Sequence, residues 1–164
     1  MTLIIKTTLP SGALHAKYSD LPGHHADCYE TEVEGPVTLP QFVEAFYTGS
    51  LFKCERVILK YTVKRPSTDA DARAIALGTA TNFAAWDMEE RNDTQLLMND
   101  MTGATKSWFM VEPLAGGSTR LRFGSVVTPN PDTGQLPRLV KPLMRFHDLY
   151  SKLLLKGAVR RLGK

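Results

Sequence analysis

The sequence predicts an α+β protein in which a curved antiparallel β-sheet wraps around a long C-terminal helix. Three observations indicate this class. Helix-capping signals recur between residues 38 and 78, hydrophobic alternation with a period of two runs from 82 to 127, and residues 138–162 form one amphipathic segment. Because an antiparallel sheet with one apolar face must cover that face, we expect the last helix to pack on it.

The size and composition indicate a single domain that spans residues 1–164. Of the 164 residues, 43% are hydrophobic and 23% are charged, as in globular proteins that build a core without metals or disulfides. The two cysteines, Cys28 and Cys54, predict buried free thiols rather than a secreted disulfide scaffold. The opening apolar run, residues 3–5, is too short for a signal peptide, and no stretch is long enough to span a membrane. We therefore expect a cytoplasmic protein.

The N-terminal part predicts an irregular arm, residues 1–23, followed by one strand. Two prolines and two glycines interrupt the arm, in which residues 3–7 are a candidate edge strand. Residues 25–34 alternate well enough for a strand, and Gly35–Pro36 ends it.

Two or three short helices are expected after this strand. Residues 38–49 begin with a Thr-x-x-Gln capping box, and residues 68–78 begin with a capping Thr and end with Gly. Between them, residues 51–61 carry apolar side chains at helical spacing, although the β-branched run near Val57 leaves a strand open as the alternative.

A four-stranded meander is expected next, joined by short turn-rich separators. Its strands are expected at about 82–90, 95–100, 106–113 and 119–127. In the last hairpin, a register with Glu112 opposite Arg120 also places Phe109 near Phe123, so that charge pairing and apolar burial agree. The same register leaves Trp108 beside a cation, so other registers stay open.

Residues 138–162 predict the final helix. The apolar stripe of this helix is expected to hold Leu139, Leu143, Phe146, His147, Tyr150, Leu154 and Ala158. From Arg138 onward the chain carries eight Lys/Arg and one acidic residue, whereas the preceding part has a net charge of −4. We expect this basic row to be mainly the solvent side of a helix that covers the sheet.

Four stretches of the sequence carry a resemblance to a known family. They are "DCYE", "FAAWDMEER", "SWFMVEPLAGGSTRLRFGS" and "FHDLYSKLLLKGAVRRL". With the order of elements over about 27–162, they resemble a bacterial subfamily of the START-like superfamily, also called the helix-grip or polyketide cyclase/lipid-transport fold. The resemblance implies a pocket for an apolar small molecule between the sheet and the C-terminal helix. It implies no reaction, because the superfamily includes cyclases, carriers and plain binding proteins. Five or six strands are expected here against seven in larger members, which favours a small or closed cavity.

The leading hypothesis is that the chain binds a small hydrophobic or amphipathic ligand in such a pocket. The expected apolar contacts are Trp86, Phe123, Phe146, Tyr150 and Leu154, and the candidate polar contacts are Ser125 and His147. A second hypothesis is an enzyme of cyclase or hydrolase type that uses His147 as acid or base. A third is a non-catalytic interaction module that forms a homodimer through an exposed Trp108. The sequence assigns no catalytic residue beyond the candidate His147.

Other classes of site are disfavoured by the residue pattern. "HHADC" holds four ligand types, but strand alternation sends His24 and Cys28 to one face and His25 and Asp27 to the other, so we expect no metal and no cofactor. Nucleic acid is disfavoured because the aromatic residues of the basic helix share its apolar stripe. Transient contact with an anionic membrane stays open.

Overall fold

The computed structural model describes residues 3–62, 64–130, 132–134 and 140–163. In this part of the chain, eight antiparallel strands form one sheet with the order β1-β3-β8-β7-β6-β5-β4, and β2 also pairs with β8. The strands are β1 (Ile5–Lys6), β2 (His25–Ala26), β3 (Tyr29–Val33), β4 (Asn82–Phe83), β5 (Trp86–Arg91), β6 (Gln95–Asp100), β7 (Thr105–Pro113) and β8 (Thr119–Val127). The predicted α+β class is confirmed.

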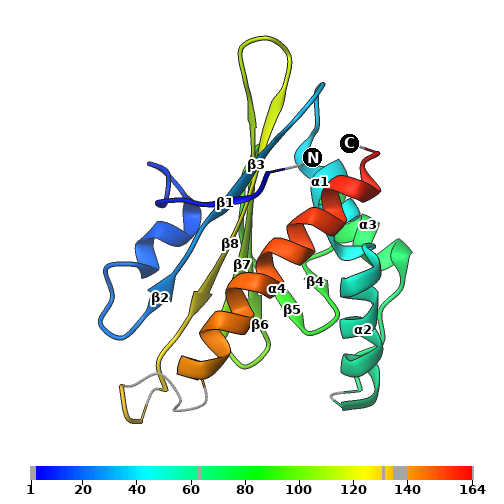
Figure 1. Cartoon of the computed structure of the whole chain (residues 1–164). Coiled ribbons are helices and arrows are strands. Elements are labelled where there is room, and N and C mark those ends of the chain that lie inside the picture. The colour runs from blue at the N-terminus through cyan, green and yellow to red at the C-terminus, as the bar shows by residue number, and fades with distance from the viewer. Residues whose placement is uncertain (1–2, 63, 131, 135–139, 164) are drawn as a thin grey trace.

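The helices lie in one layer on the inner face of this sheet, and α4 crosses the sheet diagonally (Figure 1). They are α1 (Leu39–Tyr47), α2 (Ser50–Thr62), α3 (Asp69–Leu77) and α4 (Val140–Arg161), and a short 3-10 helix, η1 (Leu14–Tyr18), belongs to the N-terminal arm. The helix predicted for residues 51–61 is confirmed, because this segment belongs to α2.

Local capping explains where two of the helices begin. Thr38 and Gln41 form the predicted capping box of α1, and Thr68 does the same for α3 with Asp71. Gly78 ends α3 in the left-handed conformation with φ 75°, which a side chain would strain.

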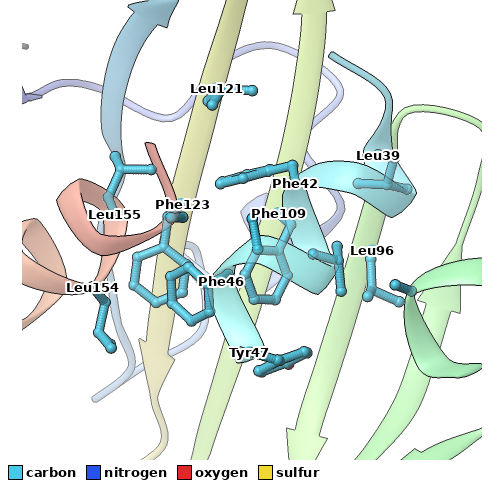
Figure 2. Packing of buried hydrophobic residues seen from close by; sticks show 14 of the residues in the cluster. Leu39, Phe42, Phe46, Tyr47, Leu96, Phe109, Leu121, Phe123, Leu154 and Leu155 are labelled. Atoms are coloured by element: carbon cyan, nitrogen blue, oxygen red, sulfur yellow. The ribbon is translucent and has the colours of Figure 1, made fainter. Parts of the chain in front are cut away.

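The main core forms where α1 meets the two central strands. Phe46 packs against Phe109 of β7 and Phe123 of β8, with ring centroids 4.8 Å and 4.7 Å apart (Figure 2). Phe42 completes the contact with its ring centroid 5.8 Å from that of Phe109. The expectation that the last helix packs on the sheet is therefore incomplete, since α1 covers the sheet together with α4.

The last hairpin has the predicted register, whereas the bounds and the number of the other strands differ from the prediction. Glu112 lies opposite Arg120 and Phe109 opposite Phe123, as predicted, while Trp108 faces Gly124 rather than a cation. The strand expected at 82–90 is divided into β4 and β5 by a tight turn. The candidate edge strand at 3–7 is present as β1, and the expected five or six strands become eight because the strand predicted at 25–34 is likewise divided, into β2 and β3.

The rotation of α4 differs from the prediction. Phe146 was expected in the buried stripe, but its side chain is 72% exposed. The buried face instead holds Ser151, Leu154, Leu155, Ala158 and Val159. Leu155 and Val159 extend this face away from Phe146, so the helix turns Phe146 toward solvent. Of the other predicted stripe members, Leu139 and the side chain of Leu143 lie outside the described part of the chain.

The outer face of the sheet carries a second, smaller core beneath the N-terminal arm. Trp108 is completely buried there together with Cys28, Leu97 and Ala13 of the arm. The expectation that Trp108 is exposed is therefore wrong: alternation on β7 turns it away from Phe109, and η1 covers it. Of the two cysteines, both free, Cys28 is buried as expected, whereas Cys54 is exposed on α2.

Candidate functional site

A partly open cavity of about 170 Å³ lies between the inner face of the sheet and the helices. Strands β5, β7 and β8 form its floor, and α1, α2 and α4 form its other walls. The lining residues are Phe46, Phe52, Glu55, Trp86, Thr105, Lys106, Ser107, Phe123, Ser125, His147, Tyr150, Ser151 and Leu154.

Most of the residues predicted to contact a ligand meet at this cavity. Six of the seven lie in its wall: Trp86, Phe123, Ser125, His147, Tyr150 and Leu154. Phe146 is not among the lining residues, because the rotation of α4 turns it outward. The role of these residues as ligand contacts stays a prediction.

Aromatic rings form the apolar part of the wall. Phe46 of α1 stands 4.7 Å from Phe123, and Phe52 of α2 stands 5.6 Å from Trp86 of β5, measured between ring centroids. The sequence pattern places Phe46 and Phe52 in helices but does not predict that these side chains face the cavity. Periodicity identifies the buried face of a helix, not the element against which that face packs.

One polar wall is a hydrogen-bonded cluster of Asp27, Ser125 and His147. Asp27 lies between β2 and β3, and its Oδ1 accepts from the backbone N–H of Ser125 at 2.8 Å and from Ser125 Oγ at 2.9 Å. His147 Nε2 lies 2.6 Å from Ser125 Oγ and 3.2 Å from Asp27 Oδ2. The Asp27 side chain is fully buried, so the carboxylate depends on these donors for the solvation it has lost.

The cluster keeps Asp27 ionised. Burial raises the pKa of this carboxyl, but the hydrogen bond and charge of His147 and the two bonds from Ser125 outweigh burial and lower the pKa below its ordinary value. A nucleophilic relay places serine and aspartate on different ring nitrogens of the histidine. Here both oxygens approach His147 Nε2, so the arrangement holds the imidazole at the cavity wall rather than activating Ser125.

Tyr29 connects this cluster to a second carboxylate, that of Asp148 on α4. Tyr29 donates to Asp148 Oδ1 at 2.5 Å and lies 3.5 Å from Asp27 Oδ2, and Lys6 of β1 pairs with Asp148 at 2.9 Å. Burial, followed by the bond to Asp148, raises the pKa of Tyr29, so its hydroxyl keeps the proton that it donates. These contacts tie α4 to β1 and β3 and fix the position of His147.

A second polar wall joins α2 to α4. Tyr150 donates a hydrogen bond to Glu55 Oε2. Burial raises the pKa of Glu55 above its ordinary value, and the bond from Tyr150 opposes only part of that effect. Among the described residues, no cation forms a salt bridge with Glu55. Next to Tyr150, the Ser151 side chain is almost completely buried, and its Oγ has no hydrogen-bond partner in the described part of the chain.

Lys106 is the lysine among the lining residues, and its ammonium group is bound to other side chains rather than free to pair with a ligand. Lys106 Nζ bonds to Glu89 Oε2 at 2.7 Å and to Asn99 Oδ1 at 2.8 Å, and it lies 4.6 Å from the centre of the Tyr18 ring. Lys106 therefore belongs to a charge network with the N-terminal arm.

The sequence missed Asp27, Glu55 and Ser151 as members of one site. Asp27 stood out only as a metal-ligand type, and within the described residues no group of three or more His, Cys, Asp or Glu is placed to hold a metal. Ser151 follows His147 by one helical turn, a spacing that could have identified it as facing the same way.

No protein-family model matches this sequence, and no curated protein shows significant similarity to it. Within the described residues, none of the helices combines the length and apolar character that a membrane crossing requires.

Proposed function

We propose that this chain is a START-like domain that binds a small hydrophobic or amphipathic ligand in the cavity between its sheet and α4. The observation that carries the proposal is one cavity with aromatic walls and two separate polar groups, the Asp27–Ser125–His147 cluster and the Glu55–Tyr150 pair. Mostly apolar walls with a few oriented polar groups are typical of small-molecule sites. The α+β arrangement, with its C-terminal helix packed over the sheet, is compatible with the helix-grip fold.

The size of the cavity limits the ligand. A cavity of about 150 Å³ accepts a benzene-sized guest, and the volume here is about 170 Å³. A single substituted ring is therefore the expected scale. A longer ligand would have to leave part of its chain outside the opening.

A titration with small aromatic compounds tests this function. Benzyl alcohol is expected to raise the melting temperature of the wild-type protein and to bind saturably in calorimetry. Ser151→Leu fills the cavity with a good helix former and is expected to abolish that binding while the protein stays folded. Ser11→Leu, at an exposed position of the arm, is the matched control and should bind like wild type. Equal binding by Ser151→Leu and wild type would place the ligand elsewhere.

A second candidate is an enzyme that uses His147 as an acid or base, and the observation that favours it is the buried carboxylate beside the imidazole. Asp27 holds His147 Nε2 at 3.2 Å while part of the ring reaches the cavity. His147→Ala would abolish turnover of small esters or enolisable ketones if this candidate is right. Unchanged turnover in the variant would remove His147 from the mechanism.

A further inference from the structure

Glu55 is a cavity-wall carboxylate that accepts a hydrogen bond from the neutral hydroxyl of Tyr150. We propose that the cavity selects a small organic cation, a primary ammonium group on an apolar or aromatic body, with the ammonium against Glu55. This inference rests on the proposed function, because it names the class of ligand that the same cavity takes.

The acceptors at this end of the cavity match an ammonium group. A primary ammonium has three N–H donors and no acceptor. Glu55 supplies carboxylate oxygens, and Ser151, which lines the same cavity, supplies a buried hydroxyl oxygen without a partner among the described residues. A buried polar atom without a partner is costly, so a ligand that donates to Ser151 Oγ offsets that cost.

The surrounding rings favour the same charge. Phe52 and Trp86 stand 5.6 Å apart between centroids at an interplanar angle of 49°, and both line the cavity beside Glu55. Aromatic faces carry a negative potential and attract cations, most strongly for tryptophan. An alkylammonium ion is therefore stabilised by the rings as well as by the carboxylate.

The charges around the cavity disfavour an anionic ligand. Of the nearby cations, Lys106 is held by Glu89, and Arg56 of α2 pairs with Asp69 at 2.7 Å. His147 is already engaged with the carboxylate of Asp27. Within the described part of the chain, a carboxylate or phosphate would find no uncommitted lysine or arginine in the wall and would meet Glu55, a group of like charge.

Three ligands of one size separate the contributions of charge and apolar body. Benzylamine, benzyl alcohol and benzoate share the ring and differ in charge, and each is titrated calorimetrically at pH 8. We expect benzylamine to bind at least tenfold more tightly than benzyl alcohol, and benzoate to bind most weakly. Glu55→Gln keeps an acceptor for Tyr150 but removes the charge, so it should abolish the preference for benzylamine while benzyl alcohol binds as before. Glu34→Gln, at an exposed position, is the matched control and should keep the wild-type order.

The outcomes distinguish this inference from the function beneath it. Binding of benzyl alcohol without a preference for benzylamine in the wild-type protein would overturn the inference and leave the proposed function standing. An unchanged preference in Glu55→Gln would also overturn it. Failure of all three ligands to bind would overturn both. If Glu55→Gln does not fold, the order of affinities in the wild-type protein alone decides.

Discussion

His15 shows how one buried side chain joins the two sides of the sheet. Its ring stacks on Trp108 with centroids 4.1 Å apart, and its Nε2 bonds to the backbone oxygen of Asp27 at 3.0 Å. The side chain of Asp27 belongs to the cavity cluster on the inner face. The backbone oxygen of the same residue holds the arm in place. Asp27 therefore links the arm to the candidate site.

The buried His15 predicts a loss of stability in mild acid. Burial lowers the pKa of His15 below its ordinary 6.5, against the smaller opposing effects of Asp27, so the folded protein holds this ring neutral. Below about pH 6.5 the unfolded chain takes up a proton that the folded chain does not, and stability falls as the pH decreases toward the folded pKa. Urea unfolding at pH 7.5 and 5.5 measures this, and His15→Gln should lose less stability between the two values. An equal loss in both proteins would contradict the assignment.

Gly124 is required by the close approach of the arm to β8. A Cβ at this position would lie 2.4 Å from the backbone oxygen of Asp27 and 2.8 Å from His15 Nε2. Gly124→Ala should therefore destabilise the protein by roughly 1–3 kcal/mol or more, the usual cost of overpacking. Gly157 of α4 has no atom within 4 Å of its Cβ position, so Gly157→Ala should instead stabilise it by roughly 0.5–1 kcal/mol. Chemical denaturation of the two variants compares them, and equal effects would contradict the packing described.

At the scale of elements, sequence reasoning succeeded where the signal is local. The capping box at Thr38, the N-cap at Thr68 and the register that joins Glu112 to Arg120 depend on residues a few positions apart, and the structure confirms all three. The strands β6 and β8 also begin and end where the alternation predicted. Local hydrogen bonding and charge pairing explain this agreement.

The rotation of α4 about its axis could not be predicted, because it depends on tertiary contacts that the sequence pattern does not identify. Phe146 and Leu154 both fit an apolar stripe, and only the positions of α1 and α2 decide which of them is buried. Glu55 was absent from the predicted site for the same reason, since its position in the cavity wall depends on how α2 lies beside α4. The covering of Trp108 by the arm was unpredictable for a similar reason, because η1 carries no strong periodic signal.

The exposed face of α4 is the candidate surface for the contact with an anionic membrane that the sequence leaves open. Phe146, Leu149 and Leu153 are 72%, 55% and 45% exposed, and Lys156 and Arg160 continue the same face. Apolar residues beside cations are typical of helices that lie on lipid surfaces. We expect vesicles with anionic lipid to bind the protein in a co-sedimentation assay and neutral vesicles to bind it weakly.

One substitution on this face and one on the arm test the part that the face plays in the contact. Leu149→Ser should reduce binding to anionic vesicles severalfold, because it removes exposed apolar area without touching the core. Leu21→Ser, at an exposed position of the arm, is the control and should leave binding unchanged. Equal binding by both variants would exclude the α4 face as the contact.

At the scale of the whole molecule, the sheet separates two cores with different roles. The outer core around Trp108 is sealed by the N-terminal arm, whereas the inner core around Phe46 and Phe109 leaves a cavity beside it. The chain contains only two tryptophans, and they fall on opposite sides of this division: Trp86 lines the cavity and Trp108 is buried under the arm.

The two indole N–H signals therefore give the most direct test of ligand binding in the cavity. In a two-dimensional ¹⁵N–¹H NMR titration with benzyl alcohol, assigned with Trp86→Phe, the Trp86 signal should move saturably. The Trp108 signal should stay in place, because Trp108 Nε1 donates to Gln95 Oε1 at 2.8 Å on the far side of the sheet. A stationary Trp86 signal at saturating ligand, or a movement confined to Trp108, would contradict a binding site between the sheet and α4.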